Sequence, residues 1–202
     1  MAMTERRASA MQRSNPLTGA ALARRLDIVL HRVKELKGDA IVAVDGEIGS
    51  LDDLYFEDQR WGVRYLVVTT GGWLTGRKLL VSPNAFDRER SSREAIRLQI
   101  TREEVEKSPG MASDRHLRSS SEVIGYALEA PDGEIGHVED ILVDDSNWAI
   151  ADIVIDTRKW LPGGKRVLLA PSAVEGIDWP KRKVRVRLSR EEIRNFPEAP
   201  PL

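Results

Sequence analysis

The stretch Asp45-Gly46-Glu47-Ile48-Gly49, followed by Trp61, decides the fold because the chain contains it twice. It returns as Asp132-Gly133-Glu134-Ile135-Gly136, followed by Trp148, with every residue displaced by 87 positions. One residue is inserted near Gly164, and beyond it the displacement is 88. A register preserved over so long a range indicates a duplicated structural unit.

Each unit consists of short runs rich in β-branched residues, separated by Gly, Asp and Pro, which is typical of strands joined by turns. Because closing a small sheet removes its exposed edges, the sequence predicts a mainly β fold of two small antiparallel β-barrels in tandem, preceded by an amphipathic N-terminal α-helix. The predicted boundaries are a flexible tail over 1–16, the helix over 17–37, a first barrel over 38–109, a linker over 110–122, a second barrel over 123–197 and a tail over 198–202.

The helix prediction depends on apolar residues at steps of four and three. These residues are Leu22, Leu26, Val29, Val33 and Leu36. We expect this apolar stripe to pack on a barrel or on another chain. A basic amphipathic helix at a membrane surface is the alternative.

The composition is that of a soluble globular protein. The 202 residues are 41% hydrophobic and 31% charged, and no stretch approaches the roughly 18 apolar residues of a spanning helix. Cysteine is absent, which excludes disulfides and thiolate chemistry. We therefore expect a cytoplasmic location and no membrane association. Charge is uneven: residues 123–180 carry four Lys/Arg against eleven Asp/Glu, and residues 181–202 carry seven against three.

The repeated residues resemble the PRC-barrel family. The resemblance is carried by Asp-Gly-Glu-Ile-Gly, by Asp53 or Asp140, by the Trp before a Val/Ile-rich strand, by Trp-Leu and by a closing Leu/Val-Leu-hydrophobic-x-Pro. It is closest to bacterial two-repeat PRC-barrel proteins, and it is more distant to the cytoplasmic domain of the photosynthetic reaction-centre H subunit and to the C-terminal domain of the ribosome-maturation factor RimM. The resemblance implies a small barrel used as a docking surface.

The sequence predicts no catalytic, cofactor or metal-binding residues. Turns and close backbone packing explain the repeated glycines, and the spacing of a phosphate-binding loop is absent around Lys165. The repeated acidic residues could bind a hard cation, but turn formation is favoured, with a structural hydrogen bond at Asp53 and Asp140. His137 is matched by Ser50 in the other unit, so the fold does not require it.

The candidate interaction surface combines repeat-related tryptophans with a basic strand. Large aromatic rings dominate cores and interfaces alike, and alternating basic residues form either a charged edge that resists aggregation or a surface for RNA or an acidic partner. The candidates are Trp61, Trp73, Trp148, Trp160, Lys183, Arg185 and Arg187. The ridge of Lys183, Arg185 and Arg187 is peculiar to the second unit.

We therefore expect a non-enzymatic protein-interaction or scaffold module with a protein partner, and the sequence leaves a homodimer open. One alternative is a ribosome- or RNA-associated maturation factor, which would bind RNA or a ribosomal protein. Another alternative is a peripheral regulator at the photosynthetic or another inner membrane.

Overall fold

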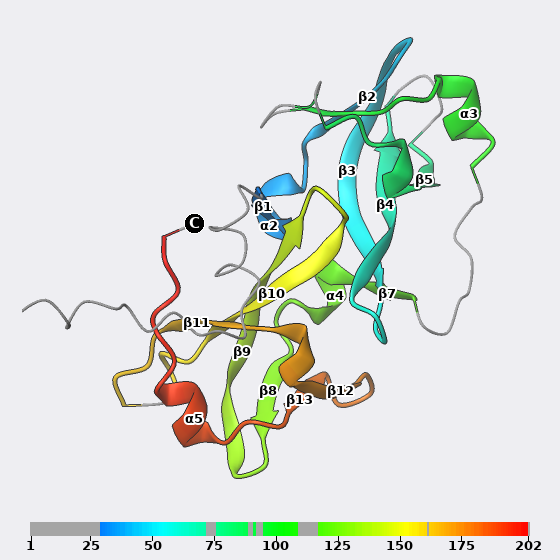
Figure 1. The fold of residues 1–202 in the computed structure, drawn as a ribbon. Coiled ribbons are helices and arrows are strands. Elements are labelled where there is room, and N and C mark those ends of the chain that lie inside the picture. Colours follow the sequence, from blue (N-terminus) through cyan, green and yellow to red (C-terminus); the bar gives the residue numbers. More distant parts are fainter. Residues whose placement is uncertain are drawn as a thin grey trace, which may run out of the picture.

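The computed structural model describes residues 29–71, 76–88, 91, 95–108, 117–160 and 162–201. The fold is mainly β, and short helices lie between the strands (Figure 1). The elements in chain order are β1 (Leu30–Arg32), α2 (Val33–Leu36), β2 (Ala40–Ala43), β3 (Gly46–Glu57), β4 (Gly62–Thr70), β5 (Lys78–Val81), η1 (Pro83–Ala85), β6 (Ala95–Arg97), α3 (Arg102–Glu106), β7 (Leu117–Ser119), α4 (Ser120–Val123), β8 (Ala127–Ala130), β9 (Gly133–Asp144), β10 (Ala149–Asp156), β11 (Arg166–Leu169), η2 (Pro171–Ala173), β12 (Val174–Asp178), β13 (Lys183–Val186) and α5 (Arg190–Arg194).

Two sets of elements follow the same order, except that β12 has no counterpart among the described elements of the first set, and we call them the first repeat (Ala40–Glu106) and the second repeat (Ala127–Arg194). In each, three antiparallel pairings join consecutive strands, β2 through β5 and β8 through β11. The last strand of each repeat returns beside its first strand in parallel, β6 on β2 and β13 on β8. The expected antiparallel pairing therefore holds for the hairpins but not for this returning strand.

A closing helix ends each repeat, and both helices begin with the same capping arrangement. Thr101 and Ser189 accept a hydrogen bond from the backbone N–H of Glu104 and Glu192, whose carboxylates bond back to the caps. The hydrogen bonds that the carboxylates of Glu104 and Glu192 accept from Thr101 and Ser189 lower the pKa of both glutamates. Such reciprocal bonds satisfy N–H groups that a helix start otherwise leaves without partners. In Figure 1, α3 and α5 lie at opposite ends of the molecule.

The segment before each repeat pairs with the other repeat. Strand β1 precedes the first repeat but is antiparallel to β9, with Leu30 opposite Asp144. Strand β7 precedes the second repeat but is antiparallel to β3, with Leu117 opposite Glu57. We call Leu30–Leu36 and Leu117–Val123 the leading segments. Their exchange means that each repeat is completed by chain belonging to the other.

The two repeats meet directly at β4 and β10. The N–H of Val63 donates to the carbonyl of Trp148 at 2.8 Å, and the N–H of Ile150 donates to the carbonyl of Trp61 at 2.7 Å. The backbone of both tryptophans adopts the left-handed conformation, with φ of 56°. Among the described strands the hydrogen-bonded order β12-β13-β8-β9-β10-β4-β3-β2-β6 is an open path. Two separate closed barrels are thus not confirmed, and the described strands form an open sheet of many strands.

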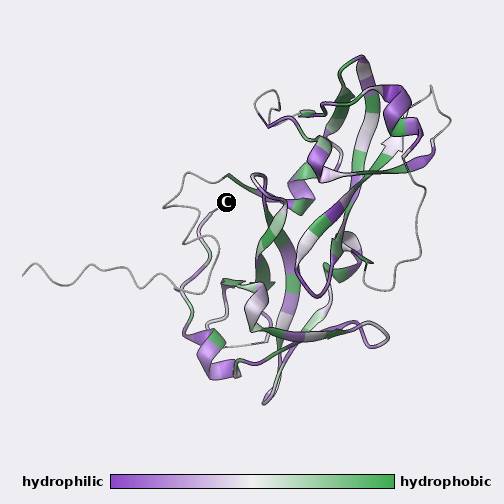
Figure 2. Ribbon diagram, turned by 45° about the vertical axis from the view of Figure 1, so that its right-hand side comes forward, coloured by the Kyte–Doolittle hydropathy of each residue, from purple (hydrophilic) through white to green (hydrophobic). Residues whose placement is uncertain are grey.

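One hydrophobic core runs through both repeats, from Val33 to Ile193. Hydrophobic and hydrophilic residues alternate along the long strands, as expected when one face is buried (Figure 2). A smaller cluster of Leu142, Val154 and Leu168 lies apart from the main core, and Leu30 and Ala199 pack on it. The shared core makes the repeats one packing unit.

Glycine is required at two pairs of repeat positions. Gly46 and Gly133 have φ of 137° and 131°, which side chains rarely adopt. Gly49 and Gly136 have no room for a side chain, because an added Cβ would overlap a backbone carbonyl oxygen of the facing strand. The structural interpretation of the repeated glycines is therefore confirmed.

The structure differs from the sequence prediction in the N-terminal segment, the linker and the C-terminal tail. The helix expected over 17–37 is not confirmed: residues 17–28, like the tail over 1–16, lie outside the described residues, Leu30–Arg32 is a strand, and only Val33–Leu36 is helical. Within the expected linker, residues 117–122 belong to β7 and α4. In the expected C-terminal tail, the N–H of Ala199 donates to the carbonyl of Arg166 at 2.8 Å.

Candidate interaction surface

The repeat-related aspartates hold the exchanged leading segments. Asp53 accepts hydrogen bonds from the hydroxyls of Ser119 and Ser120 and from the N–H of Ser121. Asp140 accepts one from Nε of Arg32 at 2.8 Å and one from the N–H of Lys34 at 3.2 Å. Each carboxylate therefore sits at the start of the helix that the other repeat supplies, where N–H groups lack partners. This is the structural hydrogen bond expected at these positions.

Two further acidic pairs recur at the same displacements. Asp52 binds Nζ of Lys78 at 2.6 Å, and its counterpart Glu139 binds Nε of Arg166 at 2.6 Å. Asp58 binds Nε of Arg118 at 2.9 Å in the same way that Asp145 meets Nε2 of His31 at 3.1 Å. Within the described ranges no group of three or more His, Asp or Glu side chains is placed to hold a metal ion.

Trp61 and Trp148 lie at the junction of the repeats. Trp148 is only 7% exposed, and its ring meets the edge of Phe86 at 5.1 Å. Trp61 is half-buried and stacks on Phe56, with ring centroids 5.4 Å apart. Both rings pack against the core, so most of their surface is occupied within the chain.

The second tryptophan pair is only partly described. Trp73 lies outside the described residues. Trp160 is half-buried, donates from Nε1 to Glu134 at 3.2 Å, and lies 5.3 Å from the ring of His137. Nδ1 of His137 is buried and has no hydrogen-bond partner. His137 thus packs beside Trp160, and the structure adds no acid–base partner to it.

The basic ridge on β13 is partly neutralised. Nζ of Lys183 binds Glu129 of the neighbouring β8 at 2.6 Å, and this hydrogen bond raises the pKa of Lys183. Arg185 and Arg187 are exposed, and Arg187 also donates to the carbonyl of Ser172 at 3.4 Å. Two of the three cations therefore face solvent.

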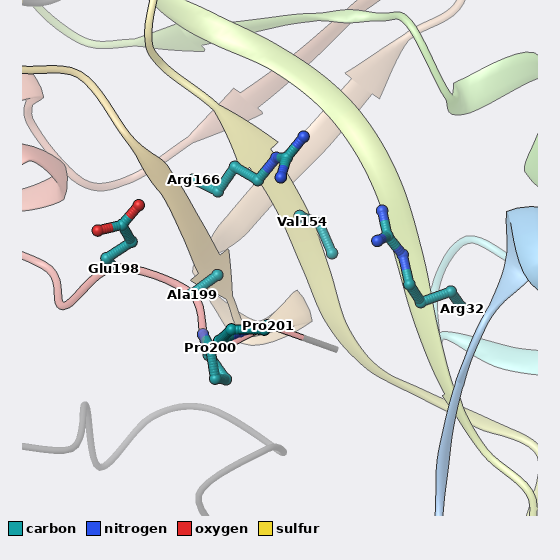
Figure 3. Close-up of a pocket in the computed structure, with 7 residues that line it drawn as sticks. All are labelled: Arg32, Val154, Arg166, Glu198, Ala199, Pro200 and Pro201. Atoms are coloured by element: carbon teal, nitrogen blue, oxygen red, sulfur yellow. The ribbon is translucent and has the colours of Figure 1, made fainter.

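A first cavity, of about 650 Å³, lies under the C-terminal segment. Its lining consists of Arg32, Val154, Arg166, Glu198, Ala199, Pro200 and Pro201. Figure 3 shows Arg32 and Arg166 on either side of Val154. Because Asp140 and Glu139 already bind these arginines, the cationic walls are compensated inside the chain.

A second cavity, of about 750 Å³, lies where β1 and α2 meet the turn between β9 and β10, and we call it the junction cavity. Buried Leu36, Ile96 and Trp148 supply apolar walls, together with Phe86. Its polar walls consist of His31, Glu35, Asp39, Arg88, Ser91 and Asp145. Asp145 links two of these groups, because it meets Arg88 as well as His31 at 3.1 Å. A cavity with apolar walls and a few polar groups has the usual character of a binding site.

Residues 29–105 match the family model of the PRC-barrel domain. The PRC-barrel range contains the first repeat up to α3 and also its leading segment, although that segment pairs with β9 of the second repeat. No curated protein matches the chain. In the described residues, no helix is long and apolar enough to cross a membrane.

The PRC-barrel range supplies every residue of the junction cavity except Asp145 and Trp148. Of these lining residues, only Trp148 is a candidate from the sequence. Ser91 stands opposite Trp179 at the displacement of 88. This difference between the repeats is the sequence signal that would have pointed to the other lining residues. Among the described candidates, Trp61 and Trp148 lie at the junction of the repeats, Trp160 lies beside His137, and Lys183 lies beside Glu129.

Proposed function

We propose that the chain is a non-enzymatic protein-interaction module built from two PRC-like repeats. The match of residues 29–105 to the PRC-barrel domain supports this for the first repeat. The element order, which matches except for β12, together with the paired capping boxes and the exchanged leading segments, supports a second PRC-like repeat over the rest.

The proposal rests on a difference in role between the polar residues that recur in both repeats and the features found in only one repeat. Those that recur in both repeats, such as Asp53 and Asp140, bind partners inside the chain and hold the repeats together. Features found in only one repeat, the exposed Arg185 and the junction cavity, are left accessible. Because the recurring residues stabilise the fold and the non-recurring features are accessible, the chain suits the recognition of partners better than the turnover of a substrate.

The test is affinity capture with the full chain as bait, at low and high salt. We expect one partner to be retained in stoichiometric amount by the folded chain and lost from a bait unfolded by heat before capture. Retention by the unfolded bait would point to non-specific apolar adhesion. A turnover activity abolished by substitution of one polar residue, with the fold intact, would refute a non-enzymatic role.

Association with RNA is the second candidate, and the exposed Arg185 on β13 and Arg187 just after it favour this candidate. Each phosphate contact adds about 0.7 to the salt dependence of single-strand binding. Substituting both arginines by serine should then reduce the slope of log K against log salt by about 1.4, measured with a fluorescent single-stranded RNA. Arg194→Ser on α5 is the matched control, and equal slopes for the two variants would dismiss this candidate.

A further inference from the structure

The junction cavity has a counterpart in the molecule, related to it by the repeat. His31 and Asp145 form one side of the junction cavity, and Arg118 and Asp58 hold the equivalent positions at the displacement of 87. Both are pairs between a leading segment and the turn that follows a long strand, β9 or β3. The same position in the fold therefore occurs twice. We call the one with His31 and Asp145 the first version and the one with Arg118 and Asp58 the second version.

The second version is filled by Trp179. The guanidinium carbon of Arg118 lies 4.3 Å from the centroid of the Trp179 ring, and Tyr126 meets this ring edge-on at 5.7 Å. Tyr126 is fully buried and donates its hydroxyl to Glu122 at 2.8 Å. Burial, followed by that hydrogen bond, raises the pKa of Tyr126 to about 12. An indole is thus held between a cation and a phenol.

The first version lacks both aromatic rings. Ser91 stands opposite Trp179 and Asp39 opposite Tyr126. The alignment of Ser91 and Asp39 follows from the sequence displacement. The N–H of Gln99 donates to the carbonyl of Ala85, as that of Arg187 does to Ala173, so the chain is placed alike up to this point. Beyond it the backbones differ, because the N–H of Ser91 donates to the carbonyl of Asp87 in a turn, whereas Trp179 follows strand β12.

Ser91 is held firmly at this position. Its hydroxyl donates to the carbonyl of Asp87 at 2.6 Å and accepts from the N–H of Arg97 at 2.9 Å. Replacement of two large rings by two small polar side chains leaves the space that the junction cavity occupies.

The remaining walls suit an aromatic guest. Leu36 is 7% exposed and Ile96 3%, and with Phe86 and Trp148 they provide an apolar lining. Nε1 of Trp148 is buried without a hydrogen-bond partner, so a donor remains to be satisfied among the cavity residues.

Charge narrows the choice of guest. Three carboxylates, those of Glu35, Asp39 and Asp145, line the junction cavity against the guanidinium of Arg88 and the imidazole of His31. Acidic walls favour an aromatic group carried by a basic segment. The chain's own guest has this character, because Trp179 is followed by Pro180, Lys181 and Arg182.

We propose that the junction cavity binds a tryptophan side chain of a partner protein, presented by a basic segment and seated as Trp179 is seated in the second repeat. This names the partner chemistry of the interaction module and rests on that proposed function. The second repeat satisfies its own site, and the first repeat offers the equivalent site to another chain.

The probe for the test is a synthetic peptide of residues 176–184, Gly-Ile-Asp-Trp-Pro-Lys-Arg-Lys-Val, titrated into the full ¹⁵N-labelled chain. We expect saturable shifts of the indole N–H of Trp148 and of the amides of His31 and Ser91. The same peptide with alanine in place of tryptophan should bind at least tenfold more weakly. No saturable shift at millimolar peptide, or equal binding of both peptides, would overturn the proposal.

Ser91→Trp closes the cavity by copying the second repeat, and we expect it to abolish peptide binding while the chain keeps its fold. If Ser91→Trp does not fold, Asp39→Tyr provides the same test by filling from the opposite side. Glu175→Gln, at an exposed position of β12, is the control that should bind normally. Undiminished binding by a folded, filled variant would refute the site.

The site and the proposed function can fail separately. A cellular partner captured equally by the wild-type chain and by Ser91→Trp would refute the site and leave the interaction function standing. Peptide binding without any captured partner would support the site and count against the interaction function.

Discussion

The same substitution, aspartate to asparagine, should have unequal effects at the two repeat-related carboxylates. At Asp53 one oxygen faces the hydroxyl of Ser119, which can rotate to accept a hydrogen bond from the new amide. At Asp140 one oxygen faces Nε–H of Arg32, and the other faces the N–H groups of Lys34 and Ile141. The amide nitrogen of an asparagine there would oppose a donor in either orientation.

The magnitudes follow from this geometry. Asp53→Asn exchanges charged for neutral hydrogen bonds and keeps all partners, which should lower the free energy of unfolding by about 1 kcal/mol. Asp140 is fully buried, and its replacement leaves the mostly buried guanidinium of Arg32 with only the longer contact to Glu35 at 4.0 Å. Breaking such a pair costs about 3 kcal/mol.

Urea unfolding of the full chain measures both effects. A difference of about 2 kcal/mol between the variants corresponds to roughly 1 M in the midpoint, given slopes of 1–3 kcal/mol/M. Asp52→Asn is the matched control, because Asp52 pairs with an exposed lysine and should contribute less than about 1 kcal/mol.

A double variant tests the cause. Arg32→Ser combined with Asp140→Asn gives the serine–asparagine pairing of the Asp53→Asn variant, so it should recover at least about 1.5 kcal/mol relative to the sum of the single changes. Equal costs at Asp53 and Asp140, or strictly additive costs in the double variant, would refute the reasoning.

Two further predictions concern local packing and acid stability. Gly49→Ala should lower the free energy of unfolding by roughly 3 kcal/mol or more, because its Cβ would overlap a carbonyl of β4. Gly62→Ala has open space around the added Cβ and should change the free energy of unfolding by less than about 1 kcal/mol. Comparable denaturation midpoints for the two variants would contradict this. Hydrogen bonds from Arg158 lower the pKa of Asp156 from 3.8 to about 2, so its stabilisation is complete above pH 4 and lost as the pH falls toward 2. Midpoints of Asp156→Asn and the wild type should therefore converge over that range, while those of Gly62→Ala, which changes no titrating group, should keep a constant offset from the wild type. A constant offset for Asp156→Asn as well would argue against the pairing.

Much of the architecture could be predicted because local signals are repeated. The turn at Gly46 and Gly133 depends on short stretches of chain, and the structure confirms it. The displacement of 87, then 88, aligns the elements of the two repeats.

The exchange of the leading segments could not be predicted from helical spacing. Leu30–Arg32 lies within the helix predicted over 17–37 but forms a strand, because it pairs with Leu142–Asp144, more than 100 residues away. Tertiary pairing overrides local preference in such short segments. A comparison of Leu30 with Leu117 would have extended the repeat upstream and revealed the second leading segment.

The site was harder to predict because it depends on a difference between repeats. Similarity drew attention to Trp61 and Trp148, which serve the junction. The junction cavity arises where similarity ends, at Ser91 opposite Trp179. Aromatic content alone gave no indication of which tryptophan marks a recognition position.

The exchanged leading segments make the chain a tethered analogue of a domain-swapped dimer. Each repeat lends a strand and a helix start to its neighbour, so the pair has the reciprocity of a twofold homodimer within one polypeptide. A fragment comprising only residues 29–108 would carry β1 without β9 and would leave β3 without β7. Two copies of that fragment could complete one another, which gives a physical route from a single-repeat ancestor to the present chain, with fusion supplying the high effective concentration that association otherwise requires.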